Sequence, residues 1–373
     1  MKNRNNTPLV LITIAVSMMG WPNTALSSDD LDDILNQYRN KYNLPALGAI
    51  VVKNGMTVGI GAVGHRKNGS EKEIGRSDKW HIGSCSKAMT ATLVAKLIER
   101  GVLNWETTIQ EVFPKLKMRQ EYRNVTIKEL LTHRAGLPSE FTIPELWAKL
   151  WENYDSPPIE QRLFLMKRLL NRPAVHTPGT GYLYSNSGYT IAAAMVEKLT
   201  GQSWEELMIK EIFTPLDMKS AGFGPPRQTN PGSEPVGHNN EGVPVESGHS
   251  ADNPSAIAPG GKIHCTLMDW AKFINIHLMG ARGKSNLLKA QSFKILHTPP
   301  EGQEYALGWI RTEREWADGW VLTHSGSNNL WFAVVWIAPK KDLAVMVVSN
   351  MGGDRAKVGC DATAWELIQK YVD

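Results

Sequence analysis

Segments with strand character lie at both ends of this 373-residue chain, and they limit the folds that it can adopt. Near the amino end, residues 47–53 and 56–64 are apolar and are joined by Asn54-Gly55, a dipeptide typical of a two-residue hairpin turn. Four further segments of this kind lie near the carboxyl end, at 306–313, 319–325, 331–339 and 343–350. The chain contains no internal repeat, so we expect both ends to contribute to one antiparallel sheet.

The residues between these ends have helical character. Apolar positions recur at helical spacing in five stretches, at 126–133, 142–153, 159–170, 187–201 and 267–280. Two more helices are expected beside the sheet, over 29–42 and 363–372. The sequence therefore predicts an α+β fold, in which an antiparallel sheet is flanked by terminal helices and carries an inserted, mostly helical region.

The boundaries of this arrangement follow from the same patterns. The sheet part is expected at about 28–80 and 300–373, and the helical region at about 81–299. Within that region, residues 222–257 are rich in Pro, Gly, Asn and Ser and lack periodicity, which predicts a long surface loop. Residues 28–373 are thus expected to form one unit, with the helical region interrupting the sheet part in sequence.

The first 27 residues have the pattern of an export signal. Two basic residues precede an apolar stretch from Leu9 to about Trp21, which is shorter than the ~20 residues that a helix needs to span a bilayer. Ala25 and Ser27 fit a signal-peptidase site. We interpret residues 1–27 as a cleaved signal peptide, with an uncleaved anchor as the alternative. The mature chain is then expected to be periplasmic or secreted, without a stable membrane anchor.

Composition and charge exclude several kinds of partner. The formal charge is +4, and no run of basic residues interleaved with aromatic residues occurs, so no nucleic-acid partner is expected. The ten histidines lack compact metal-ligand spacing, and we expect neither a metal nor an organic cofactor. The three cysteines, Cys85, Cys265 and Cys360, can form at most one disulfide, and Cys85 is interpreted as a small buried apolar residue.

Ser84 and Lys87 form the pair on which the functional prediction depends. They lie three positions apart in HIGSCSKAMTATL, residues 81–93, and a helix places such positions on one face with Cβ atoms about 5–6 Å apart. The positive end of the helix dipole favours negative charge that develops on the serine, whereas this field and burial lower the pKa of the lysine. A neutral amine beside a hydroxyl group can act as a general base.

A Ser-x-x-Lys pair alone is a weak signal, but two further motifs accompany it. A Tyr184-x-Asn186 motif lies in PGTGYLYSNSGY, a glycine-rich turn that opens a helix, and a His324-x-Gly326 motif lies in GWVLTHSGSNN. With these motifs the sequence resembles the serine hydrolases of the β-lactamase and penicillin-binding-protein superfamily, and most closely its class C-like branch. Three other segments resemble that branch, at 130–138, 215–224 and 258–265.

The resemblance implies a β-lactamase/D,D-peptidase-like fold whose cleft has three walls. In such a cleft Ser84 attacks a carbonyl and forms an acyl-enzyme, which water then releases. Lys87 and Tyr184 share the general-base and general-acid roles, and which of them takes the serine proton is left open. Asn186 is expected to hold either the carbonyl side of the substrate or the Lys87 ammonium.

The third wall is expected to be a strand at the edge of the sheet that carries His324, Gly326 and Ser327. The backbone N–H groups of Ser84 and Ser327 would form an oxyanion hole, in which each donor typically contributes about 3–4 kcal/mol. The expected partner is a small-molecule or peptide acyl substrate. A Gly-x-Ser-x-Gly elbow is absent from the sequence, which argues against an α/β-hydrolase.

One departure from the superfamily pattern bears on the substrate. His324 stands where the β-lactamases and D,D-peptidases of this superfamily carry a lysine that helps to bind the substrate carboxylate, and histidine is often neutral near pH 7. We therefore expect an esterase- or peptidase-like enzyme that acts on an ester, amide or peptide without an obligatory carboxylate. The alternatives are a β-lactamase or D-alanyl-D-alanine carboxypeptidase, with Arg134 or Arg227 as the cation, and a penicillin-binding sensor without turnover. Trp147 and Trp151 are expected either to line an apolar acyl pocket or to pack their helix onto the core.

Overall fold

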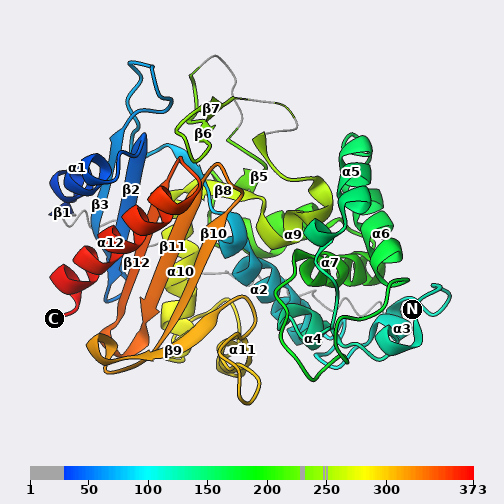
Figure 1. Ribbon diagram of the computed structural model, residues 1–373. Coiled ribbons are helices and arrows are strands. Elements are labelled where there is room, and N and C mark those ends of the chain that lie inside the picture. Colours follow the sequence, from blue (N-terminus) through cyan, green and yellow to red (C-terminus); the bar gives the residue numbers. More distant parts are fainter. Residues whose placement is uncertain (1–28, 227–231, 247, 249–250) are drawn as a thin grey trace, which may run out of the picture.

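The computed structural model describes residues 29–226, 232–246, 248 and 251–373 (Figure 1). The signal peptide predicted at 1–27 and the candidate cation Arg227 lie outside these residues. None of the helices in the described part of the chain combines the length and the apolar character needed to cross a bilayer.

The sheet predicted from the two chain ends is present. It has seven strands in the order β1-β3-β2-β12-β11-β10-β9. Their bounds are β1 Asp29–Asp30, β2 Ala46–Lys53, β3 Met56–Gly64, β9 Ile310–Arg314, β10 Gly319–Ser327, β11 Phe332–Ala338 and β12 Leu343–Ser349. The two ends of the chain meet where β2 pairs antiparallel with β12, with Val51 opposite Val345. Only the short β1 runs parallel to its neighbour among the pairs of this sheet.

The predicted hairpin turn joins β2 and β3. Asn54 and Gly55 both have positive φ angles, 53° and 76°. A two-residue turn between right-handedly twisted strands requires this left-handed conformation, which Asn and Gly tolerate best.

Helices cover both faces of the sheet. The terminal helices α1 (Asp32–Lys41) and α12 (Asp354–Tyr371) pack on one face, and α10 (Leu267–Ala281) packs on the other (Figure 1). The side chains of β2 alternate accordingly, because Val51 packs under the terminal helices whereas Ile50 joins the core on the α10 side. The α10 segment lies within the sequence range assigned to the inserted region, yet it packs on the sheet.

The remaining helices form the inserted region beside the sheet (Figure 1). Their bounds are α2 Ser86–Glu99, α3 Ile109–Val112, α4 Ile127–Leu131, α5 Pro144–Glu152, α6 Pro158–Leu169, α7 Asn186–Thr200, α8 Trp204–Met208, α9 Ala258–Gly261 and α11 Ala290–Leu296. Most residues of α2 are buried, and this helix contacts α7, α8, α9 and α11. It is therefore the central helix against which the other elements pack.

The prediction of a long surface loop over 222–257 is partly wrong. The described residues of this segment include β5 (Gly222–Phe223), which pairs with β8 (Ile263–Thr266), and the hairpin of β6 (Gly237–His238) with β7 (Pro244–Val245). β8 also pairs with β4 (Lys79–His81). Strands of two residues are too short to produce a periodic pattern, so the sequence could not reveal them.

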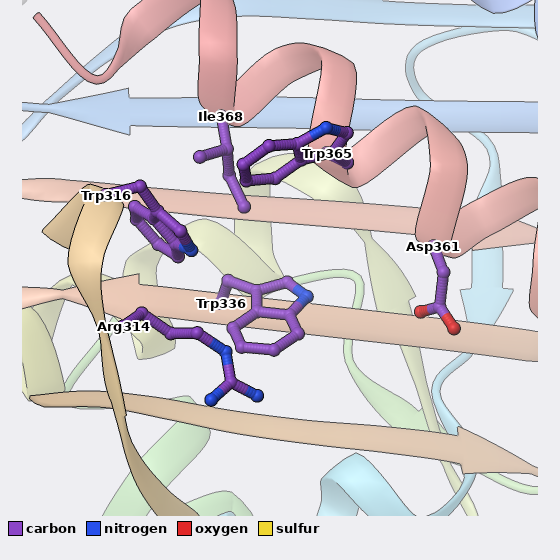
Figure 2. A pocket seen from close by; sticks show the side chains of 6 residues that line it. All are labelled: Arg314, Trp316, Trp336, Asp361, Trp365 and Ile368. Carbon is purple, nitrogen blue, oxygen red and sulfur yellow. The ribbon is translucent and has the colours of Figure 1, made fainter.

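A hollow lined by tryptophans lies between α12 and the sheet (Figure 2). Its volume is about 480 Å³, and its lining includes Trp316, Trp336 and Trp365. Trp316 and Trp336 pack on the core under the terminal helices, whereas the helix that follows Ser84 belongs to the core on the other face of the sheet. The sheet thus separates this hollow from the predicted nucleophile.

Candidate active site

Ser84 lies in a single 3₁₀ turn, η1 (Gly83–Cys85), that leads directly into α2. Gly83 has a φ of +50°, and a Cβ atom there would lie 2.3 Å from the backbone nitrogen of Ser327. Glycine therefore permits the close approach of this turn to β10. The backbone N–H of Gly83 donates to His81 Nδ1 at 3.2 Å, and His81 Nε2 contacts Asp252 Oδ2 at 3.1 Å, so buried polar groups hold the turn.

Cys85 follows the predicted nucleophile but points into the core. The three cysteines are all free and buried. Burial raises the pKa of the Cys85 thiol, which keeps it protonated and unreactive at neutral pH.

The Lys87 side chain is fully buried and ends among three oxygen atoms. Its Nζ lies 3.1 Å from Ser84 Oγ, 2.6 Å from Asn186 Oδ1 and 2.6 Å from the carbonyl oxygen of Gly260. A Cβ atom on Gly260 would lie 3.0 Å from Asn186 Oδ1, so a glycine leaves room for this convergence. The predicted neighbours Ser84 and Lys87 are thus brought together, and Asn186 joins them.

The protonation state of Lys87 follows from its surroundings. Burial lowers the pKa of this amine to about 7, although the negative charge of Glu140 opposes the change. A neutral amine has two N–H donors and one lone pair. The oxygens of Asn186 and Gly260 can only accept, so they take the two donors, and the lone pair is left to face the hydroxyl of Ser84.

Tyr184 lies just before α7, near the Ser84 hydroxyl. Burial raises the pKa of its phenol, and a hydrogen bond with Ser84 opposes that rise. The residue is nevertheless 37% exposed. Lys87 Nζ lies 4.7 Å from the centroid of the Tyr184 ring. The neutral phenol is therefore placed to donate a proton rather than to accept one.

Asn186 is the first residue of α7, and its position is set by the start of that helix. Ser185 caps the helix by accepting from the backbone N–H of Ser187 at 3.1 Å. The amide of Asn186 bridges two groups, because its oxygen accepts from Lys87 while its Nδ2 donates to Glu140 Oε1 at 2.9 Å. Of the two roles expected for Asn186, the structure contains the contact with Lys87.

β10 approaches the nucleophile turn at Gly326 and Ser327. A Cβ atom on Gly326 would lie 2.1 Å from the carbonyl oxygen of Ile82 and 2.6 Å from the backbone nitrogen of Ser84. The backbones of η1 and β10 are therefore in direct contact. This contact brings the backbone segments that carry the two predicted oxyanion donors, the N–H groups of Ser84 and Ser327, close to each other.

His324 lies on the buried face of β10 and is only 4% exposed. Its Nδ1 lies 2.6 Å from the carbonyl oxygen of Ser325, so Nδ1 carries the proton, and the hydroxyl of Tyr305 donates to Nε2 at 3.0 Å. Burial, and then the charge of Lys87, lower the pKa of His324 to about 3. Its ring is therefore neutral and its two nitrogens have internal partners.

Several residues of the site were not identified from the sequence. They are Glu140, Tyr305, His133 and the carbonyl of Gly260. His133 is buried with a φ of +59°, and its ring centroid lies 4.4 Å from that of Tyr184. Both His133 and Gly260 lie in segments that resemble the superfamily, 130–138 and 258–265, whereas no sequence signal pointed to Glu140 or Tyr305.

Two groups of residues with open roles can now be placed. Arg134 donates to the carbonyl of Gly179, which turns its guanidinium toward that loop. Trp147 packs against the core and contacts Phe141, with ring centroids 4.7 Å apart and the ring planes tilted by 52°. Trp151 lies next to Trp147, with centroids 6.0 Å apart. Packing of α5 thus accounts for Trp147, while Phe141 is 51% exposed beside Glu140.

Comparison with known proteins agrees with this fold. The sequence matches the Beta-lactamase family over residues 31–369. Protein flp from Staphylococcus aureus strain MW2 is 25% identical over 339 residues, which cover 88% of this chain and 64% of flp. This chain therefore spans less than two thirds of the length of that relative. Penicillin-binding protein 4 from Amycolatopsis lactamdurans is 24% identical, with 84% of this chain and 83% of that protein covered.

Solved structures share the fold. The octameric penicillin-binding protein homologue from Pyrococcus abyssi has a TM-score of 0.71 and 22% identity, over 91% of this chain and 78% of that one. A D-stereospecific amidohydrolase from Streptomyces sp. also has a TM-score of 0.71, with 20% identity over 89% of this chain and 98% of that one. At these identities the likeness concerns the fold alone.

The fold and the family match define the class of protein as the superfamily of β-lactamases and penicillin-binding proteins, whose members are generally serine hydrolases. Within it, the chain belongs to the β-lactamase family. The family resemblance and the fold class expected from the sequence are thereby confirmed.

Proposed function

We propose that this protein is a serine acyl hydrolase that cleaves ester, amide or peptide substrates through an acyl-enzyme on Ser84. The observation that carries the proposal is the environment of Lys87 Nζ, where two pure acceptors take its N–H donors and Ser84 Oγ lies 3.1 Å away. With a pKa lowered by burial to about 7, a large fraction of this amine is neutral at physiological pH. Lys87 is thus the favoured base for Ser84.

The proposed reaction has two stages. Ser84 Oγ bonds to the substrate carbonyl carbon while its proton passes to Lys87, and the N–H groups of Ser84 and Ser327 donate to the oxyanion. The carbonyl re-forms as the bond to the leaving group breaks, and Tyr184 or the Lys87 ammonium returns a proton to that group. Water then attacks the acyl ester on Ser84. Lys87 or Tyr184 accepts the proton of this water, and a proton returns to Ser84 Oγ as the bond to the acyl group breaks.

The surroundings of the site support a substrate without an obligatory carboxylate. The neutral, internally bonded ring of His324 provides no positive charge on β10. Two exposed aromatic residues lie close to site residues in sequence. Tyr182, which is 43% exposed, precedes Tyr184 by two residues, and Phe141, which is 51% exposed, follows Glu140. We infer that apolar acyl or leaving groups bind better than anionic ones.

A β-lactamase or D-alanyl-D-alanine carboxypeptidase activity is the second candidate. It is favoured by the similarity to Penicillin-binding protein 4. We also propose, from the sequence alone, that the leader at 1–27 exports the enzyme to the periplasm or the medium.

Parallel assays of the mature protein distinguish the two candidate activities and test the proposed nucleophile. Hydrolysis of p-nitrophenyl butyrate, of a D-Ala-D-Ala peptide and of a chromogenic cephalosporin is measured with wild type and Ser84→Ala. We expect turnover of the ester that Ser84→Ala abolishes, with little turnover of the cephalosporin. Faster turnover of the peptide or the cephalosporin would favour the second candidate, and equal rates in Ser84→Ala would refute the proposed nucleophile.

A further inference from the structure

Glu140 is a buried acid one amide group away from Lys87. It begins the 3₁₀ turn η3 (Glu140–Thr142) and has no exposed surface. Both of its oxygens accept from neutral donors, because Oε1 takes Asn186 Nδ2 at 2.9 Å and Oε2 takes the Ser187 hydroxyl at 2.6 Å. Burying a carboxylate is costly without a compensating charge, and the cation that interacts with this one is Lys87.

The bridging amide of Asn186 has only one orientation that satisfies both neighbours. The Glu140 carboxylate can only accept hydrogen bonds, and the Lys87 ammonium can only donate them. The NH₂ group of Asn186 must therefore face Glu140, which leaves the amide oxygen toward Lys87. Without the carboxylate, only the contact with Lys87 would orient the amide, and a neutral Lys87 amine can accept a hydrogen bond as well as donate one, so either flipped form would then be possible.

We propose that Glu140 is a positioning residue for the reaction described above: it holds the Asn186 oxygen against Lys87 and supplies the negative charge that balances the lysine after it takes the Ser84 proton. The proposal rests on the proposed function, because the role concerns the base of that reaction. In this role Glu140 acts through its negative charge as well as through its hydrogen bonds to Asn186 and Ser187.

The other groups near Lys87 act differently on its charge. Those that face it from the surrounding elements are Cys85 in η1, His133 after α4, Tyr184 before α7, Tyr189 in α7 and His324 in β10. The phenols and the thiol have pKa values raised by burial and the imidazoles have pKa values lowered by burial, so all five are neutral near pH 7. Glu140 is therefore the charge that opposes the lowering of the Lys87 pKa.

The test compares Glu140→Gln with wild type and with Glu211→Gln. The activity kcat/KM requires neutral Lys87 and so rises as the pH rises through its pKa. Removing the carboxylate lowers that pKa. The acid limb, which is the rising part of the pH profile of kcat/KM, then moves to lower pH. The comparison is made one pH unit below the wild-type midpoint, with kcat/KM of each enzyme expressed as a fraction of its own maximum at high pH. We expect this fraction to be about threefold or more larger in Glu140→Gln than in wild type. Glu211 is a buried acid paired with Arg100, away from Lys87, and Glu211→Gln should leave the limb in place.

Three further experiments make the outcome independent of folding losses and of the reaction. Glu140→Asp keeps the charge and should restore the wild-type midpoint. If Glu140→Gln does not fold, Asn186→Ala cuts the same bridge and should also move the limb to lower pH. NMR titration of Lys87 in protein labelled with ¹³C at lysine Cε, assigned by its loss in Lys87→Arg, reports the same shift without substrate.

The results separate the two proposals. An unchanged Lys87 titration midpoint in folded Glu140→Gln would overturn the role of Glu140, whatever the activity. Hydrolysis that persists in Ser84→Ala would overturn the proposed function, while a shifted Lys87 midpoint would still support the electrostatic contact.

Discussion

The contact between Gly326 and the nucleophile turn predicts a large effect of adding one methyl group. In Gly326→Ala the new Cβ would lie 2.1 Å from the carbonyl oxygen of Ile82, and Cβ contacts below 3.0 Å are essentially not observed. The atoms it meets belong to the backbones of Ile82, Ser84 and Cys85, so no side chain can turn away to make room. β10 and η1 must therefore separate by about 0.9 Å.

This separation acts directly on the predicted oxyanion hole, whose two donors lie on the two elements that move apart. A misplacement of about 1 Å can lower a rate by roughly 10²-fold. We therefore expect kcat/KM of Gly326→Ala to fall by about 10²-fold or more. Overpacking typically costs about 1–3 kcal/mol of stability, so the free energy of unfolding should fall as well.

The assay is hydrolysis of p-nitrophenyl butyrate together with urea unfolding, and the matched control is Gly75→Ala. At Gly75 the nearest atom to an added Cβ is Asp78 Oδ2 at 3.9 Å, an ordinary contact. The control should keep its activity. A folded Gly326→Ala with wild-type kcat/KM would contradict this prediction, because the nucleophile turn and β10 would then tolerate separation without loss of function.

The other predictions concern the base, the acid and the buried charges. Lys87→Ala and Tyr184→Phe should each reduce kcat by about 10²–10⁴-fold in stopped-flow or steady-state assays, since each removes a positioned proton donor or acceptor. Arg162→Met leaves two carboxylates without their cation and should lower the free energy of unfolding by about 3–5 kcal/mol in urea titrations. Burial lowers the pKa of His277 and lowers that of His297 to about 3. The stability that their neutral forms contribute is complete above the histidine pKa of the unfolded chain, near 6.5, and is lost as the pH falls toward 3. The urea concentration at half-unfolding should therefore be lower at pH 5 than at pH 7.

Much of the fold follows from local sequence patterns. The hairpin at Asn54-Gly55 depends only on turn geometry, and the apolar strands need only an alternating or continuous apolar pattern. The last helix shows the limit of such patterns. It begins at Asp354, nine residues before the predicted start at 363, because its first turns bury the small residues Ala356, Gly359 and Cys360 instead of large apolar ones.

The candidate site was predictable to the extent that its chemistry lies in short motifs. Ser84, Lys87, Tyr184 and Asn186 belong to such motifs, and the structure gathers them. Glu140 is different, because it meets Asn186 only through packing of η3 against the start of α7, 46 residues along the chain. The partner of His324, Tyr305, likewise lies outside any motif and is positioned by the fold.

Time-resolved intact mass spectrometry with peptide mapping shows directly whether Ser84 carries the acyl group. The mature protein is mixed with p-nitrophenyl butyrate, quenched in acid at intervals, and compared with Ser84→Ala. We expect a transient butyryl adduct that maps to the peptide containing Ser84, disappears as substrate is consumed, and never forms in the variant. An adduct on another residue, or hydrolysis by Ser84→Ala at the wild-type rate, would contradict this expectation.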